Sequence, residues 1–303
     1  MSTVTITEKP LAIEDLLAIV EGAQVELAAD ARTVIAASRA VVDSALASRT
    51  AVYGLTTQVG HGRDTRLTEE ESRSEQMFLV MSHSGGIGPS LSTSRVRAAL
   101  AVRLNGIARG WSGASSEVAD VLVAMLNAGV HPVVPEIGSV GAGDLAPMAS
   151  MAQVAIGQGQ AEYQGEVVSG GEALERAGIK PLVLSGKDGL ALISANGVSI
   201  GHAALVIPRA EWLINAADIA ADCQWRRPRP IPRSSIPLWD ALNRSLGKRR
   251  WLIISASCSQ GARCYSPALP DPYRTHSHSE SYPRSMGRFV STSRPPGTPQ
   301  LWN

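Results

Sequence analysis

The glycines between Gly138 and Gly143 mark the most distinctive segment of the chain, which reads Gly138-Ser-Val-Gly-Ala-Gly-Asp-Leu-Ala-Pro147. A glycine-rich turn between a strand and a helix can cradle the phosphates of a dinucleotide. Here the spacing is GxxGxG instead of GxGxxG, and Pro132 and Pro135 would interrupt the preceding strand. No alternation of strands and helices surrounds the segment, so the sequence argues against dinucleotide binding.

Three further residues carry groups that could act on a small molecule: the phenol of Tyr53, the imidazole of His83 and the amide of Asn196. A free tyrosine has a pKa of about 10, so Tyr53 would need a special environment to act as a base. Each residue also has a plainer interpretation, as a half-buried tyrosine with a satisfied hydroxyl, a structural histidine or an asparagine that caps a turn. The sequence has no GxSxG elbow, phosphate loop or metal-ligand cluster, so we predict no metal.

The elements that must position these residues are mostly helices. Thr68 and Glu71 have capping-box spacing, Asp30 is placed to cap the second helix, and Gly129 is placed to end the fifth in the left-handed conformation. From apolar periodicity and these signals, we expect helices over 13–21, 31–47, 69–82, 93–109, 115–127 and 145–156.

Irregular, glycine-bearing segments separate these helices at 53–66, 84–90 and 130–143, and loops on a helical scaffold are where chemistry tends to lie. Alternation around Gly165 predicts a small β-hairpin over 161–169. An apolar segment runs from 189 to 221, where Pro208 is expected to bend or interrupt it. The sequence therefore predicts a mainly α fold with a loop-borne site and a small β-hairpin.

Composition divides the chain at about residue 221. Residues 1–221 hold 15 Lys and Arg against 23 Asp and Glu, whereas residues 222–303 hold 13 against 4. The second part also holds all three cysteines and most of the prolines, without a sustained helical or strand period. We predict an active-site region over 1–221 and an irregular, basic tail over 222–303, which arises from a reading-frame shift or is a genuine disordered extension. Nucleic acid is not expected as a partner, because the Arg/Pro run lacks a recognised binding module.

The chain is 44% hydrophobic, which is enough for a substantial core. No basic segment followed by an apolar run opens the sequence, and no stretch of about 18 consecutive apolar residues is present. The sequence predicts a cytoplasmic protein without a membrane segment.

The segment from Gly138 to Pro147 resembles the signature of the histidine and phenylalanine ammonia-lyase family, which reads Gly-Ser-Val-Gly-Ala-Ser-Gly-Asp-Leu-Ala-Pro. In that family the Ala-Ser-Gly tripeptide cyclises into 4-methylideneimidazol-5-one (MIO), an electrophile that needs no external cofactor. The resemblance implies that Ala142 and Gly143 belong to the catalytic tripeptide. It also implies that Asp144 assists ring closure, and its position before a helix suggests that it caps that helix.

Other segments resemble the same family in the same order, and together they cover most of residues 1–221. Tyr53 lies in a segment similar to the family's Tyr-Gly-x-x-Thr-Gly-x-Gly loop, with Gln58 where glycine is usual, and would remove the β-proton of the substrate. His83 lies where histidine-type lyases carry a substrate-selecting histidine. Asn196 would contact the prosthetic ring or the substrate carboxylate, whereas Asn105 and Arg109 match a scaffold helix.

The chain departs from the family pattern in two places. The serine expected between Ala142 and Gly143 is absent, so the sequence predicts that MIO does not form. Family members also continue with about as many residues again, and they assemble as homotetramers through long helices that are not recognisable after residue 221. We therefore expect the N-terminal part of the aromatic amino acid lyase fold, with apolar helix faces left exposed.

The resemblance implies non-oxidative loss of ammonia from an aromatic L-amino acid, to give the trans-unsaturated acid. Histidine is the first expectation for the substrate, chiefly because of His83, and tyrosine or phenylalanine is the alternative. The chain as written is expected to be inactive. Two other interpretations stay open: an MIO-dependent 2,3-aminomutase, and a non-catalytic remnant or subunit that pairs with an intact paralogue.

Overall fold

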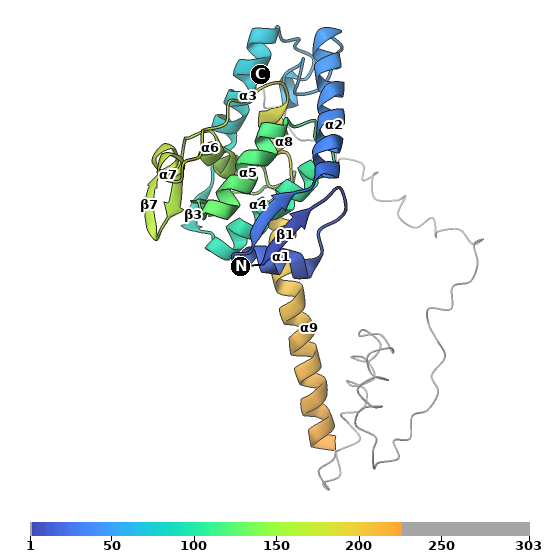
Figure 1. The fold of residues 1–303 in the computed structure, drawn as a ribbon, viewed down its shortest axis with the longest axis vertical. Coiled ribbons are helices and arrows are strands. Elements are labelled where there is room, and N and C mark those ends of the chain that lie inside the picture. The colour runs from blue at the N-terminus through green and yellow to red at the C-terminus, as the bar shows by residue number, and fades with distance from the viewer. Residues whose placement is uncertain (1, 226–303) are drawn as a thin grey trace, which may run out of the picture. The chain divides into compact units, whose positions relative to one another are not determined.

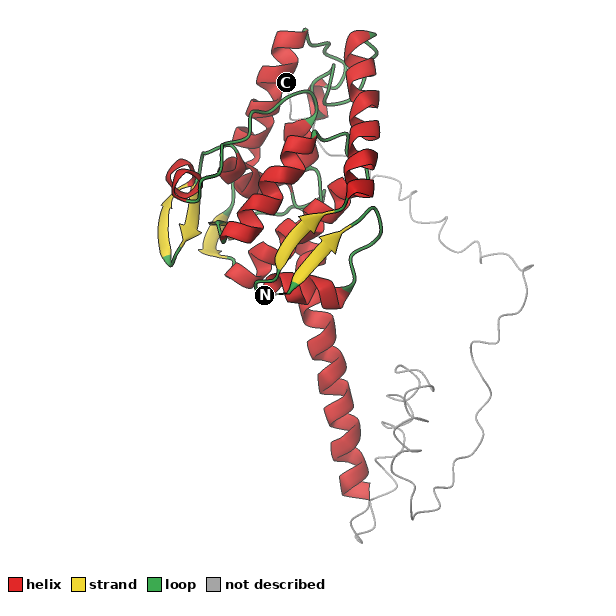
Figure 2. Cartoon of the chain, in the orientation of Figure 1, coloured by secondary structure: helices red, strands yellow, loops and turns green. Residues whose placement is uncertain are grey.

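The computed structural model describes residues 2–225, and the predicted tail lies outside these residues except for its first four positions. Helices dominate the described part (Figure 2), which confirms the mainly α prediction. The helices are α1 (Ile13–Val20), α2 (Ala29–Ala47), the short 3-10 helix η1 (Gly60–Gly62), α3 (Glu69–His83), α4 (Thr93–Ala108), α5 (Ser116–Ala128), α6 (Leu145–Ala155), α7 (Gly170–Arg176), α8 (Asp188–Ile193) and α9 (Gly197–Trp225). The strands are β1 (Thr3–Ile6), β2 (Gln24–Leu27), β3 (Ile87–Ser90), β4 (His131–Pro132), β5 (Pro135–Ile137), β6 (Gln160–Tyr163) and β7 (Glu166–Ser169).

Helix α4 lies at the centre of the core and is buried on nearly every side. It packs against α1, α5 and α9 (Figure 1). The approach of α9 is close, because a Cβ atom added to Gly201 would lie only 3.0 Å from backbone atoms of Ala98 and Ala99. A larger residue at 201 would therefore push these two helices apart.

Two of the three helix-end signals in this part of the sequence are confirmed. Thr68 and Glu71 form both hydrogen bonds of the capping box, and Gly129 ends α5 at a φ of 73°. The prediction that Asp30 caps α2 is wrong, because the helix begins at Ala29 with Ala28 as its N-cap. The Asp30 carboxylate instead accepts a hydrogen bond from the N–H of its neighbour Ala31, at 2.7 Å.

Three small sheets join segments that are distant in sequence. The predicted hairpin is present as β6 and β7, and β4 extends it on the other side of β6. The sequence did not reveal that β1 and β2 pair in parallel, or that β3 and β5 pair in antiparallel register, with Ile87 opposite Ile137. The β3–β5 pair matters for function because it brings the segment after His83 beside the Gly138 loop.

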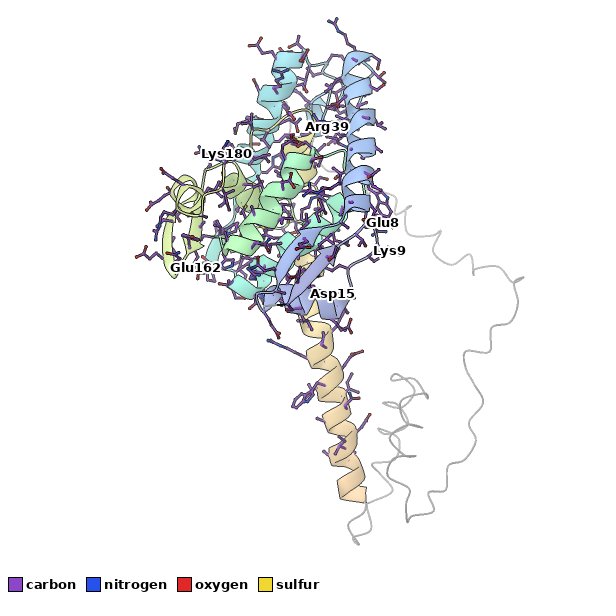
Figure 3. The ribbon with its side chains drawn as sticks, in the orientation of Figure 1. Glu8, Lys9, Asp15, Arg39, Glu162 and Lys180 are labelled. Atoms are coloured by element: carbon purple, nitrogen blue, oxygen red, sulfur yellow. The ribbon has the colours of Figure 1, made fainter. Side chains whose placement is uncertain are left out.

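A buried carboxylate connects three helices, α2, α5 and α8. Asp188, at the start of α8, is fully buried and accepts hydrogen bonds from the N–H and hydroxyl groups of both Ser115 and Ser185. Arg39 of α2 (Figure 3) forms an ion pair with the same carboxylate, in which Nη1 lies 3.2 Å from Oδ1 of Asp188. Five donors therefore surround one carboxylate and fix the ends of α5 and α8 against α2.

The apolar stretch after residue 188 forms two helices rather than one. The break lies at 194–196, between α8 and α9, whereas α9 continues without interruption through Pro208. The predicted interruption at Pro208 is therefore wrong. Among the described residues, Asp188–Ala221 is the one stretch long and apolar enough to cross a membrane by length and composition, which is weak support for a span because core helices pass the same test.

Candidate active site

The glycine loop begins at a tightly packed position beside the segment that follows His83. A Cβ atom added to Gly138 would lie 3.2 Å from both the Cα of Gly86 and the Cβ of Ala146. The contact follows from the β3–β5 pairing, which places the two loops next to each other. The N-terminal end of the loop is therefore held by backbone packing.

The other end of the loop is held by hydrogen bonds to the start of α9. Asp144 is buried, and its carboxylate accepts from the N–H and the hydroxyl of Ser199, each at 2.7 Å. Its own N–H donates to the carbonyl of Ala195 at 2.8 Å. The prediction that Asp144 caps the helix after it is wrong, because its side chain makes no capping bond to α6 and instead caps α9, whose N-terminus favours negative charge.

Between these two ends, the five residues from Ser139 to Gly143 form an exposed turn. The Ser139 hydroxyl donates to the carbonyl of Gly143 at 3.1 Å and closes the turn from inside. Gly141 and Gly143 have φ values of +87° and +82°, a conformation that side-chain-bearing residues rarely adopt. Val140 is 88% exposed at the tip.

A cavity of about 340 Å³ lies between this turn and the first turns of α9. The Asn196 side chain faces this cavity: its Oδ1 lies 3.6 Å from the position of a Cβ atom added to Gly143. The amide makes no hydrogen bond with any described residue, so its donors and acceptor are available to a small polar molecule. The lining residues are Ser139, Gly141, Gly143, Asp144, Asn196, Ser199, Ile200 and Ala203.

Tyr53 lies in the irregular segment between α2 and α3 and is 52% exposed. Its phenol oxygen accepts a hydrogen bond from the N–H of Gly60 at 2.9 Å. Because a backbone N–H can only donate, this contact stabilises negative charge on the phenol oxygen. Tyr53 does not line the 340 Å³ cavity.

His83 is the last residue of α3 and is partly buried. Its Nδ1 lies 2.8 Å from the carbonyl oxygen of Leu79, and because a carbonyl only accepts, Nδ1 carries the proton. The Nε2 atom of the neutral ring is then an acceptor. The neighbouring Ser84 accepts a hydrogen bond from the Gln153 amide at 2.8 Å, which ties this segment to α6.

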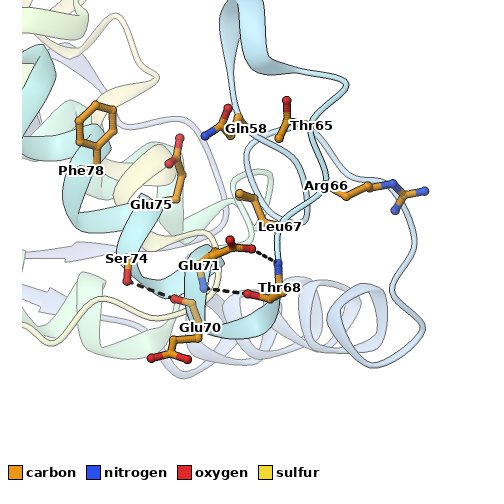
Figure 4. A pocket seen from close by; sticks show the side chains of 10 residues that line it. All are labelled: Gln58, Thr65, Arg66, Leu67, Thr68, Glu70, Glu71, Ser74, Glu75 and Phe78. Carbon is orange, nitrogen blue, oxygen red and sulfur yellow. Dashed lines mark hydrogen bonds between the residues drawn. The ribbon is translucent and has the colours of Figure 1, made fainter.

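A larger hollow of about 570 Å³ lies elsewhere, between the segment after Gln58 and the outer face of α3 (Figure 4). Its walls include the Thr68–Glu71 capping box and several exposed carboxylates, and none of the predicted site residues lines it. We therefore place the candidate site at the smaller cavity.

The structure brings three of the six predicted site residues to one cavity, Gly143, Asp144 and Asn196, and places Ala142 in the adjoining turn. Tyr53 and His83 lie on other segments and do not line it. Ser199 was missed by the sequence reasoning, because its partner Asp144 lies 55 positions away and no local pattern links them.

Comparisons with known proteins identify the family to which the chain is similar. Residues 11–224 match the family described as "Aromatic amino acid lyase". The chain is 42% identical over 236 residues to a histidine ammonia-lyase of Treponema denticola, an alignment that covers 77% of this chain and 46% of that protein. The chain spans less than half the length of the curated relatives it matches.

Solved structures show the same similarity. A histidine ammonia-lyase from Trypanosoma cruzi superposes with a TM-score of 0.67 at 32% identity, covering 72% of this chain and 43% of that one. A tyrosine aminomutase from Streptomyces globisporus superposes with a TM-score of 0.66 at 33% identity, covering 69% of this chain and 39% of that one.

Proposed function

The chain belongs to the aromatic amino acid lyase family, and from this premise we propose that it is the active-site part of a histidine ammonia-lyase-type enzyme. Such an enzyme removes ammonia from an aromatic L-amino acid without oxidation and releases the trans-unsaturated acid. The observation that supports this proposal is the convergence of the Gly138 loop, Asp144 and Asn196 around one cavity at the start of α9. Histidine is the proposed substrate, and the cytoplasm is the proposed location.

Each site residue has a proposed role that matches its surroundings. Tyr53 would accept the β-proton of the substrate as a phenolate, and the Gly60 N–H donates a hydrogen bond to the oxygen that would receive the proton. His83 would select the aromatic ring through its Nε2 atom, because Leu79 engages Nδ1. The unengaged amide of Asn196 would hold the polar end of the substrate.

The family's prosthetic group does not fit the residues present in this chain. MIO is built from Ala-Ser-Gly, whereas the turn here reads Gly141-Ala142-Gly143 and contains no serine at the ring position. Ser139 is no substitute, because its hydroxyl is engaged with Gly143 and Val140 follows it where ring closure needs glycine. We therefore propose that the chain as written keeps a substrate pocket but does not perform the elimination.

Two other functions keep support from particular observations. The likeness to a tyrosine aminomutase is as strong as the likeness to a histidine ammonia-lyase structure, so migration of the amine is the second catalytic candidate. The missing serine favours a non-catalytic subunit that pairs with an intact paralogue and assembles as family members do. Co-expression with an intact relative tests this subunit role. Co-purification of the two chains would support it, and purification of this chain alone would contradict it.

Turnover by the purified 303-residue chain tests the catalytic part of the proposal. We expect no urocanate from L-histidine, followed by its absorbance, and no cinnamate-type or β-amino product from L-tyrosine or L-phenylalanine. Appearance of the unsaturated acid would contradict the inactive assignment, and appearance of a β-amino acid would favour the aminomutase.

Ligand-dependent stability tests the pocket separately from turnover. A ligand that binds only the folded state raises the melting temperature with concentration. We expect L-histidine to give a saturable rise in the Tm of the full chain, and Asn196→Ala to remove this rise without lowering the Tm of the free chain. The absence of any rise with L-histidine, L-tyrosine or L-phenylalanine would contradict the proposed pocket.

A further inference from the structure

The turn between Gly138 and Asp144 is one residue shorter than the family signature, and the structure indicates where the shortening has been absorbed. We infer that Ala142 occupies the ring-central position of the turn, which intact members fill with serine, and that the missing residue has been lost from the N-terminal side. The inference rests on the proposed function, because it concerns the same loop.

Asp144, at the C-terminal end of the turn, fixes which residue takes which position in the ring. Asp144 is held by three hydrogen bonds of 2.7–2.8 Å, two from Ser199 and one to Ala195. Gly143 lies directly against this anchor, with Ala195 O and Asn196 Oδ1 at 3.5 and 3.6 Å from the position of an added Cβ. Counting back from the anchor, Gly143 supplies the attacking nitrogen, Ala142 the central residue and Gly141 the carbonyl carbon.

The N-terminal side of the turn has the freedom to absorb a deletion. Val140 is 88% exposed, and a Cβ atom added to Gly141 would meet no atom within 4 Å. The Ser139 hydroxyl spans the shortened turn by donating to the Gly143 carbonyl. A residue removed here costs few contacts, whereas one removed next to Asp144 would break the anchor.

The residue at the ring-central position decides whether the electrophile can form. Attack of the Gly143 nitrogen on the Gly141 carbonyl carbon would form the five-membered ring, and the carbonyl oxygen would leave as water with the protons of the two amide nitrogens. The exocyclic double bond then requires loss of a second water, made from an oxygen on the central Cβ and the proton on the central Cα. Ala142 has no oxygen on Cβ, so the second step would need a two-electron oxidant.

A single substitution therefore replaces the missing group without lengthening the loop. Ala142→Ser gives Gly-Ser-Gly directly before the anchored Asp144, and it changes an exposed residue. Intact mass spectrometry of the purified full chain is the measurement. We expect the parent chain to keep its full mass and Ala142→Ser to lose the mass of two waters.

Val140→Ser is the matched control, because it places a serine directly before Gly141, so that the same turn again contains serine followed by glycine but out of register with Asp144. We expect it to keep its full mass. A second variant, with serine inserted between Ala142 and Gly143, restores the family tripeptide and should also lose two waters. Circular dichroism melting checks that each variant is folded.

Several results would overturn the inference. The register is wrong if the insertion variant loses two waters while folded Ala142→Ser does not, or if Val140→Ser loses as much as Ala142→Ser. If neither Ala142→Ser nor the insertion variant loses water, the turn held by Asp144 cannot support ring closure. Because these readouts involve no substrate, they are independent of the L-histidine experiment that tests the proposed function.

Discussion

At the scale of single residues, the structure depends on two buried carboxylates that accept hydrogen bonds from distant segments. Asp144 accepts from Ser199 on α9, and Asp188 accepts from Ser115 at the start of α5 as well as from Ser185, three residues before it. A carboxylate has two oxygens that each accept more than one hydrogen bond, so one buried side chain can satisfy several donors at once. Asp144 in this way positions the candidate site, and Asp188 positions the helices around it.

Replacing Asp188 by asparagine should destabilise the chain strongly. The amide turns an acceptor into a donor that faces other donors, and it leaves the Arg39 guanidinium without its buried partner. Breaking a buried ion pair costs about 3–5 kcal/mol, and we expect the lower end because Arg39 is itself 18% exposed. Urea unfolding followed by circular dichroism measures the change.

Asp43→Asn is the matched control for this substitution. Asp43 is the other carboxylate partner of Arg39, but its side chain is 60% exposed. An exposed pair of this kind contributes about 0–1 kcal/mol. Equal losses of stability in the two variants would show that burial of Asp188 is not what gives it its importance.

At the scale of elements, Arg97 on α4 shows how a buried cation can stabilise helix ends. Its guanidinium donates to the carbonyl of Ile19 near the end of α1 and to that of Leu126 near the end of α5. It also lies 3.2 Å from Nε2 of His131 on β4. Burial, then the charge of Arg97, lowers the pKa of His131, whereas Glu162 on the paired strand β6 opposes this effect.

This arrangement predicts that the chain becomes less stable in mild acid. A histidine whose pKa is depressed by folding binds fewer protons in the folded than in the unfolded chain. Its contribution is therefore fully present above the ordinary value of 6.5 and is lost as the pH falls from there through the depressed pKa. Melting temperatures measured from neutral pH down to about 5 should fall in the parent chain.

His131→Gln should flatten that part of the pH profile, because glutamine can accept the Arg97 hydrogen bond but does not titrate. His61→Gln, at an exposed residue of η1, is the control and should leave the profile unchanged. If His131→Gln keeps the same decline as the parent, then other groups cause it.

Sequence reasoning worked for these elements wherever the signal was local. The capping box at Thr68, the left-handed Gly129 and the turn at Gly165 lie within a few residues of the helix or strand they shape, and all three were found. The parallel pairing of β1 with β2 and the capping of α9 by Asp144 depend on contacts between distant segments, so no local pattern reveals them. The prediction that Asp144 caps α6 is wrong for the same reason: the residue before a helix usually caps that helix, and the local sequence does not reveal the distant partner on α9.

At the scale of the whole molecule, α9 is the feature that most affects behaviour in solution. Its C-terminal part extends beyond the other helices of the described chain (Figure 1). Several of its large apolar side chains are exposed, with Trp212 at 70%, Leu213 at 63% and Ile219 at 58%. Contiguous exposed apolar surface of this kind promotes association.

We therefore expect the purified chain to self-associate in a concentration-dependent manner, as measured by sedimentation. The double substitution Trp212→Glu and Leu213→Glu should shift the distribution toward the monomer. Val183→Glu is the control, because Val183 is 86% exposed but lies away from α9, between α7 and α8. A monomeric parent chain at high concentration would contradict the expectation.

Pro208 gives α9 a further property, which concerns its local unfolding. Proline has no N–H, so the carbonyl of Ala204, a residue of the buried core, loses its helical hydrogen bond. Amides before this point are protected by packing, whereas those after it depend on a solvated helix alone. Hydrogen exchange should therefore divide α9 into a slow and a fast half at Pro208. Within the described residues, limited proteolysis should begin in the fast half and leave the loop and cavity of the candidate site on the fragment that survives.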